Sequence, residues 1–439
     1  MAMQEYLELG RLLIDFPLSY QAIKEINIRE TGNEHGRLKL TLVAAGQLSR
    51  DDILRYEDAP IQIFTPDGEG IYAGICTEIG ISCMNQYTEI MLGAGSFSVL
   101  ADRKPMTRTF QDPSKCLSQI VETVLGPYGY SVSLQKDVAI PFMLSQQEET
   151  DWAFIRRIAN QLGFMVFADS RSPMKRISIG AVPFSSLNLP PQSELKSLGK
   201  DISAFWQVKN SLAPGASAYE FLQEGYQTAD LSFGVGYGIT GGLSGQIVTG
   251  SSITASGGLL VHSFIASYQD GAYPGIEGDG ENPKQNSGNK SSASRVAAAT
   301  GTVNSSSIIS GKVLAVSGTN IQVEFSDGTA GGVRWFPYSD FLGNDFYSMP
   351  DVGDTVYCYY ENNGALICLG SKHVSTDSPD FGKPEEKVLT ANNRMIRLKA
   401  DGIDITGCRS EMDGQGGSRV RILFSDKDGI EISAEKEVN

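Results

Sequence analysis

The chain has 439 residues, and 36 Lys and Arg against 51 Asp and Glu give it a formal net charge of −15. This acidity argues against a protein that grips nucleic acid or an anionic membrane surface, because both tasks need clustered positive charge. At roughly 150 residues per domain, the length predicts about three domains. The 48 glycines favour strands and turns over long helices.

Targeting signals are not evident in the sequence. It holds no apolar run of about 18 residues, so we expect no transmembrane helix. The first residues are acidic rather than basic, which does not fit a secretory signal. We therefore predict that the chain folds in the cytoplasm.

The first hundred residues alternate between apolar and polar side chains, as half-buried strands do. The alternation is seen at Ile26 and Ile28 and again from Leu38 to Leu42. A Pro-Asp-Gly segment at 66–68 lies between two apolar runs and predicts a hairpin turn. We expect residues 1–105 to form a first hub β-barrel.

Residues 106–163 have the spacing of apolar residues that is typical of helices. Asp112 is a suitable N-cap, and Gly126 with the following proline is expected to end the first helix. A second helix is predicted to begin near Thr150 and to end at Gly163.

Residues 164–275 return to a strand pattern, and we expect a second hub β-barrel there. The strand FMVFAD is predicted to pair with RISIGAV. The Gly/Ser-rich stretch 232–258 lacks both the Walker ending and the dinucleotide register, so it is interpreted as a flexible strand-and-turn region. Residues 276–307 are small, polar and Gly-rich, which predicts a linker.

Residues 308–371 hold five short apolar runs, which predict a small Greek-key barrel of the OB type. The Asn363-Gly364 pair is a typical two-residue hairpin turn. The basic residues Lys312 and Arg334 are outnumbered by acidic ones in this segment, which argues against an OB domain that binds nucleic acid.

The last stretch, residues 372–439, holds two similar units, each with an alternating strand, an Asp-Gly turn and an Ile-x-Ile strand. Their apolar residues fall on one face, which a tail of this length cannot bury on itself. We therefore predict an intertwined β-prism to which identical chains supply the neighbours. The alternative is a self-contained pair of hairpins packed on the preceding barrel.

Two sets of residues define the faces of this tail. The proposed trimer-shaft interface consists of Ile396, Leu398, Ile403, Ile405, Ile422, Phe424, Ile430 and Ile432. The opposite face is expected to hold Arg397, Lys399, Asp404, Arg421 and Glu431.

The metal-ligating and thiol side chains are scattered. There is no CxxC pair among the six cysteines, and the three histidines, His35, His262 and His373, are far apart in sequence. This spacing matches no zinc pattern, so we predict buried free thiols and no metal site. The cysteines are Cys76, Cys83, Cys116, Cys358, Cys368 and Cys408.

These segments, in this order, resemble the VgrG-like spike proteins of contractile injection systems. That family includes the type VI secretion spike and the myophage baseplate hub fused to its central spike. Residues 145–169 are similar to the hub segment in which an acidic stretch precedes a Trp/Phe-rich helix and a strand. Residues 333–371 are similar to the OB domain, with its V-R-W strand, M-P-x-V-G-D motif and final L-G-S. Residues 396–406 and 419–433 resemble the opening strands of the triple-stranded β-helix.

The resemblance implies a mainly β fold: a hub with two tube-protein-like β-barrels and inserted helices, an OB-fold barrel, and a short C-terminal triple-stranded β-helix in residues 372–439. It implies a homotrimer that caps a hexameric, Hcp-like inner tube. Baseplate proteins, a PAAR-like tip protein and effector cargo are further implied partners. The target membrane is met by mechanical penetration on sheath contraction, and no nucleic acid is bound.

The resemblance further implies a structural protein with no catalytic residue, cofactor or metal. It would be assembled in the cytoplasm and then become part of the injection particle. Some relatives carry a lysozyme domain after the OB barrel or an iron-binding HxH tip, and this sequence shows neither. The tail is also short, which implies a blunt end without an effector extension.

Two alternatives stay open at this point. The first is a tail-associated peptidoglycan-degrading enzyme, for which Glu148, Glu149 and Asp151 can be nominated as carboxylates. Their position at a helix start is explained equally well by capping and the helix dipole. The second is a phage tail baseplate hub rather than a secretion or injection particle.

Overall fold

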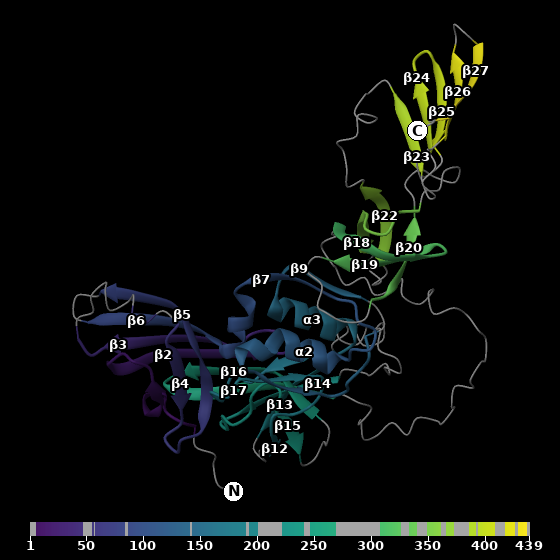
Figure 1. The fold of residues 1–439 in the computed structure, drawn as a ribbon. Helices are drawn as coiled ribbons and strands as arrows, with labels where there is room; N and C mark the ends of the chain where they lie inside the picture. The colour runs from purple at the N-terminus through teal and green to yellow at the C-terminus, as the bar shows by residue number, and fades with distance from the viewer. Residues whose placement is uncertain are drawn as a thin grey trace, which may run out of the picture.

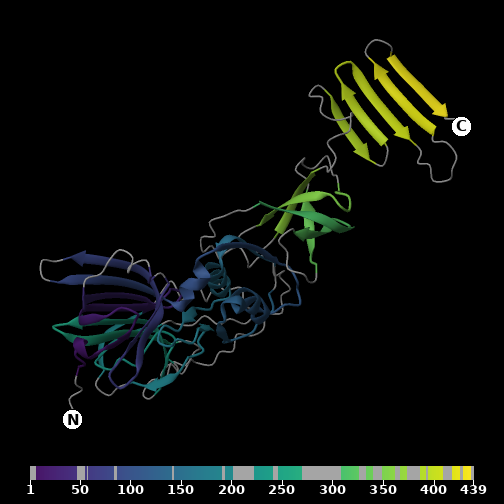
Figure 2. The same ribbon diagram turned by 60° about the vertical axis from the view of Figure 1, so that its left-hand side comes forward.

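The structure is a computed structural model. It describes residues 6–46, 55–56, 58–83, 87–140, 143–189, 193–200, 222–240, 246–268, 308–325, 333–339, 349–360, 366–372, 386–391, 394–408, 418–425 and 429–436. The chain is mainly β, as predicted. Figures 1 and 2 show three parts: a hub that contains the N-terminus, a small barrel, and a five-stranded sheet near the C-terminus.

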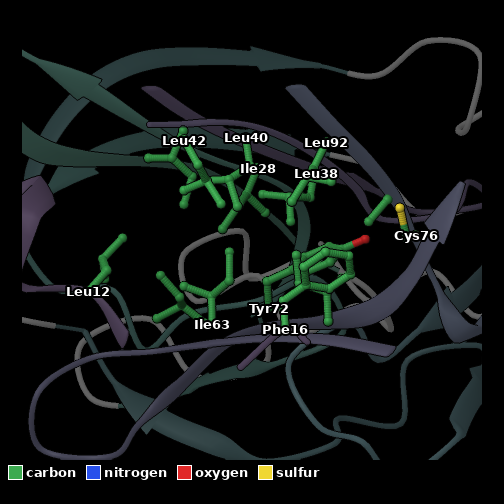
Figure 3. Packing of buried hydrophobic residues seen from close by; sticks show 14 of the residues in the cluster. Leu12, Phe16, Ile28, Leu38, Leu40, Leu42, Ile63, Tyr72, Cys76 and Leu92 are labelled. Carbon is green, nitrogen blue, oxygen red and sulfur yellow. The ribbon is translucent and has the colours of Figure 1, made fainter. Parts of the chain in front are cut away.

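The first part of the hub is an antiparallel sheet with the strand order β1-β4-β5-β6-β3-β2. The predicted alternation is confirmed, because Ile26, Ile28 and the leucines of β3 are buried in one core. Figure 3 shows Ile28 and these leucines in the core. The Pro-Asp-Gly turn joins β4 to β5, and its Gly68 has φ +88°, a left-handed conformation that favours glycine. The elements are η1 (Leu9–Arg11), β1 (Leu13–Asp15), β2 (Tyr20–Thr31), β3 (Arg37–Ala44), β4 (Pro60–Phe64), β5 (Gly70–Cys83), β6 (Thr88–Ser96) and η2 (Phe97–Asp102).

The predicted helical segment contains two α-helices and also several strands. Helix α3 (Asp151–Gln161) begins at the predicted place, where the Thr150 hydroxyl oxygen accepts from the amide of Ala153 at 3.2 Å. Trp152 and Phe154, on the buried side of this helix, pack in a second hydrophobic core. The other elements are β7 (Pro105–Phe110), α2 (Leu117–Leu125), η3 (Gly126–Tyr128), β8 (Ser131–Leu134) and β9 (Leu144–Thr150).

The predicted start of the first helix is wrong. Helix α2 begins at Leu117, whose amide donates to the carbonyl oxygen of Val138 at 2.9 Å, and Cys116 forms a β-bridge with Ala139. These contacts hold the preceding residues extended. The Asp112 carboxylate accepts instead from the amide of Ser114 at 2.9 Å, in a local turn.

The third segment of the hub supplies the remaining strands. The predicted pairing of FMVFAD with RISIGAV is confirmed, because β10 (Val166–Ala168) and β11 (Arg176–Ile179) are antiparallel neighbours. Strand β11 also pairs in parallel with β8. The others are β12 (Ser186–Asn188), β13 (Glu194–Lys200), β14 (Leu222–Thr228), β15 (Gly238–Thr240), β16 (Gln246–Ser256) and β17 (Leu259–Tyr268).

One long-range pairing joins the first and third segments of the hub. Strand β16, from the Gly/Ser-rich stretch, lies antiparallel to β2, with Ile253 opposite Ile28. Both side chains are fully buried. The two regions expected to form separate barrels therefore share a single twelve-stranded sheet. The predicted linker 276–307 lies outside the described residues.

The predicted five-stranded barrel is confirmed. Its strands close in the order β18-β19-β20-β22-β21 around a core that includes Ile321, Val323 and Val356. The predicted turn at Asn363-Gly364 lies outside the described residues. The strands are β18 (Ile308–Ser317), β19 (Asn320–Phe325), β20 (Trp335–Ser339), β21 (Thr355–Tyr360) and β22 (Leu366–Lys372).

The C-terminal sheet is an antiparallel meander in which each strand pairs with the next. Its strands lie side by side in one layer (Figure 2). They are β23 (Lys387–Ala391), β24 (Arg394–Lys399), β25 (Gly402–Cys408), β26 (Ser418–Ser425) and β27 (Gly429–Lys436).

Candidate assembly surfaces

The eight apolar residues predicted for the tail form two rows on one face of the C-terminal sheet. Residues directly opposite each other in antiparallel strands point to the same side, as do residues two apart in one strand. One row runs across β24 to β27 through Ile396, Ile405, Ile422 and Ile432. The second row runs through Leu398, Ile403, Phe424 and Ile430.

This apolar face is open to solvent in the single chain. Ile432 is 72% exposed, Ile430 67% and Leu398 46%, whereas Ile405 and Ile422 are half-buried. Leu389 on β23 lies opposite Ile396, is also exposed and extends the first row, which the sequence patterns did not indicate. A contiguous apolar patch of this kind marks an interaction surface.

The opposite face of the same sheet carries a group of charged side chains that form ion pairs within the chain. Both carboxylate oxygens of Asp404 accept from the Arg421 guanidinium at 2.9 Å, and Lys399 approaches at 3.4 Å. The hydrogen bonds from Arg421 hold the pKa of the Asp404 carboxyl below its usual range. Arg397 lies in the same register row and forms an ion pair with Glu386 at 3.5 Å.

A second contact surface joins the small barrel to the hub. Arg334, just before β20, donates from Nε to the carbonyl oxygen of Gln111 at 2.9 Å and from Nη2 to that of Ile140 at 2.8 Å. Desolvation in this junction lowers the pKa of the guanidinium. Met143 of the hub is buried among the core residues of the barrel. The two parts therefore share polar contacts and apolar packing.

The carboxylates nominated for catalysis have structural partners. Asp151 is fully buried and accepts from Arg108 Nη1 at 2.8 Å, Gln146 Nε2 at 2.8 Å and the Tyr128 hydroxyl at 2.9 Å. Glu149 pairs with a neighbouring arginine of α3, and Glu148 is exposed at φ +46°. The capping role expected of the acidic residues belongs to Thr150, and Asp151 ties α3 to β7 and β9.

A Ser-His-Asp contact that the sequence analysis did not find lies between β3, η2 and α3. His35 bonds through Nδ1 to the Ser98 hydroxyl at 2.7 Å and through Nε2 to the Asp102 carboxylate at 3.0 Å. The Ser98 hydroxyl is buried and also bonds to Ser96 at 2.8 Å. The His35 ring packs on Trp152, and burial lowers its pKa. Since the Ser98 hydroxyl is buried, these bonds connect the segment before β3 to η2 and do not present a nucleophile to solvent.

Potential ligand sites in the described residues are sparse. No group of three His, Cys, Asp or Glu side chains in this part of the chain is placed to hold a metal ion. A hollow of about 330 Å³ lies over β2, β13 and β17, lined by Arg29, Lys196 and several serines and glycines. None of the helices described here is long and apolar enough to cross a membrane.

The comparisons with known proteins identify the fold. No family model and no curated protein matches the sequence. Among solved structures, the chain is similar to the Escherichia coli c3393 protein, described as a component of the type VI secretion system with structural similarity to the T4 bacteriophage tail proteins gp27 and gp5. The TM-score is 0.53 at 14% identity, over 82% of this chain and 99% of that one.

A second solved structure matches with a similar TM-score and a similarly low sequence identity. The chain is similar to the Francisella PdpA-VgrG complex, with a TM-score of 0.55 and 10% identity, over 94% of this chain and 84% of that one. The resemblance expected from the sequence is therefore confirmed in three dimensions. The chain has the fold of VgrG-like spike proteins and of the phage tail proteins that they resemble.

Proposed function

We propose that this protein is the structural hub and spike of a contractile injection system, and that it works as a homotrimer without catalysis. The observation that carries the proposal is the exposed apolar face of the C-terminal sheet. Its eight residues lie in register, and the opposite face carries ion pairs formed within the chain. The shared fold with type VI and phage tail proteins supports the same role.

Trimerisation accounts for features that a single chain leaves unsatisfied. Full burial of an exposed Leu, Ile or Phe side chain contributes about 1.5–3 kcal/mol. The eight residues are already partly covered in the single chain, so each contributes a part of this value to a trimer. The outer strands of the sheet, β23 and β27, each pair with a neighbouring strand on one side only. Main-chain hydrogen-bonding groups along their other side have no partner within the sheet. Three sheets wound together would cover both the apolar faces and these edges, and the product would be a stiff shaft.

The remaining parts of the chain have roles in this proposal. The hub would cap a hexameric, Hcp-like inner tube and contact baseplate proteins, and the small barrel would form a collar above the shaft. A PAAR-like tip protein and effector cargo are proposed partners. Assembly would take place in the cytoplasm, and the spike would then penetrate the target envelope when the sheath contracts.

The test is the solution mass of the full chain by light scattering. We expect three times the chain mass of 47.4 kDa at micromolar concentration. A chain that ends at residue 380 lacks the C-terminal sheet, and we expect it to trimerise more weakly. A full chain that stays monomeric across this concentration range would overturn the proposal. A trimer that is equally stable without the sheet would contradict the role of the apolar face.

A further inference from the structure

Two cysteines face each other inside the small barrel. Cys358 on β21 lies directly opposite Cys368 on β22 in the antiparallel register, and their sulfur atoms are 2.7 Å apart. Both side chains are fully buried in the barrel core. In contrast, the Cys76 thiol donates to the carbonyl oxygen of Glu78, and Cys83 is exposed. The prediction of buried free thiols is therefore wrong for Cys83.

The strand pairing provides the backbone geometry that a disulfide needs. Opposite residues of antiparallel strands have Cα atoms about 4.5–5.5 Å apart. Disulfides join residues whose Cα atoms are about 4.4–6.8 Å apart. The two sulfur atoms already touch, so a bond between them requires side-chain adjustment and no movement of one strand past the other.

We propose that Cys358 and Cys368 are a modification site at which an intramolecular disulfide forms. The oxidant is a low-molecular-weight disulfide of the glutathione type. The two thiols lose two protons and two electrons, and one S–S bond forms between them. The oxidant takes up both protons and both electrons, its own S–S bond breaks, and two thiols are released.

The surroundings of the pair determine when the bond can form. The hydrogen bond between the two thiols, with Cys358 as the donor, favours the protonated form and together with burial raises the pKa of the Cys358 thiol. Since the thiolate is the attacking species, the folded barrel reacts slowly. The bond would therefore form when the barrel opens or refolds in an oxidising environment, such as the one that a spike meets outside the reducing cytoplasm. It would then link β21 to β22, the strand from which the chain continues to the C-terminal sheet, and would stabilise the barrel by constraining its unfolded state.

The first experiment maps the bond in the full chain. The protein is unfolded, refolded in a glutathione buffer poised at about −200 mV, alkylated and cleaved after glutamate. Glu361 lies between the two cysteines, so a disulfide would hold the two resulting peptides together. We expect the linked pair in most molecules, with Cys83 alkylated. Recovery of Cys358 and Cys368 both alkylated, or each joined to glutathione, would overturn the proposal.

The second experiment measures the consequence. The oxidised chain is expected to unfold several degrees above the chain kept in dithiothreitol. Cys83→Ser is the matched control and should keep this difference, whereas the double variant Cys358→Ala/Cys368→Ala should lose it. If the double variant does not fold, peptide mapping of the natural chain still shows whether the disulfide forms. Equal unfolding temperatures for the oxidised and reduced natural chain would overturn the stabilising role of the bond.

Discussion

The Nε atom of Arg334, in the small barrel, donates to the main-chain carbonyl oxygen of Gln111, in the hub, at 2.9 Å. The two residues are far apart in sequence. Together with the packing of Met143, this contact holds the barrel on the hub. In a spike, force delivered to the hub would pass to the shaft through this joint.

Replacement of Arg334 should loosen the joint. Arg334→Met keeps most of the apolar stem but removes hydrogen bonds that, for a charged donor, contribute about 1.5–3 kcal/mol. We expect amide hydrogen exchange at the barrel–hub contact to become at least about tenfold faster, and the hub to keep its own stability. Lys312→Met is a suitable control, because Lys312 is an exposed cation on β18 of the same barrel. An unchanged rate of amide exchange in Arg334→Met would show that the packing of Met143 is sufficient to hold the barrel on the hub.

A charge on the apolar face of the C-terminal sheet should prevent trimerisation. Leu398 is 46% exposed in the single chain, so we expect the single chain to tolerate Leu398→Asp. In the trimer it would place a carboxylate among apolar side chains at a large desolvation cost. We expect a mass near that of one chain at concentrations where the natural protein is trimeric. Glu431→Gln, on the polar face, should leave the mass unchanged. A trimeric Leu398→Asp variant would show that this face is not the interface.

Acid should destabilise the hub through His262. This residue is fully buried; its Nδ1 donates to the carbonyl oxygen of Asp230 at 2.7 Å, and its Nε2 accepts from the Ser251 hydroxyl at 3.0 Å. Desolvation, and then the charge of Arg171, lowers the pKa of His262 to about 3. The unfolded chain takes up this proton near pH 6.5 and the folded chain near pH 3. Stability is therefore lost as the pH falls through this interval, by at most about 1.4 kcal/mol per pH unit.

Denaturant unfolding between pH 7 and pH 4 measures this effect. We expect His262→Gln to be less stable at neutral pH and to show a smaller loss on acidification. Ser251→Ala removes a hydrogen-bond partner but keeps the imidazole, so it should keep the steeper pH dependence of the natural chain. The same pH dependence in His262→Gln would assign the acid sensitivity to other groups.

The buried carboxylate of Asp151 should be essential for stability. Asp151→Asn leaves Arg108 without its negative partner, and breaking a buried ion pair in this way costs about 3–5 kcal/mol. We expect a clear fall in the unfolding midpoint of the hub in urea. Tyr128→Phe removes one neutral donor to the same carboxylate and should cost only about 1 kcal/mol. Equal effects of the two substitutions would contradict the importance of the charge.

Local patterns in the sequence predicted the elements whose stability is local. The spacing of apolar residues after Thr150 placed the start of α3, although the cap is Thr150 and not an acidic residue. The alternation in the tail placed Leu398 and Ile403 on one face. The start of α2 could not be placed in this way, because a main-chain contact between Leu117 and Val138 outweighs the capping preference of Asp112. Capping preference is a short-range effect, and contacts with a segment farther along the chain can override it.

These local sequence patterns could not predict contacts between segments that are far apart in the chain. No spacing in the sequence indicates that Arg334 meets the carbonyl oxygen of Gln111, since carbonyl groups are present at every residue. The same holds for the contact of His35 with Ser98. Cys358 and Cys368 lie in strands predicted to form one hairpin, but a two-residue turn at Asn363-Gly364 would place Cys358 opposite Leu369. The observed register, with Cys358 opposite Cys368, could therefore not be predicted from that turn.

The pairing of β2 with β16 has a consequence for how the chain is made. The partners Ile28 and Ile253 are separated by more than 200 residues, so the first sheet leaves the ribosome long before its neighbour exists. At about 5–20 residues per second, this interval is on the order of ten to forty seconds. Throughout it, the hydrogen-bonding edge of β2 is open to any other strand. Nascent chains of this protein should therefore depend on chaperone protection until the Gly/Ser-rich stretch has been synthesised.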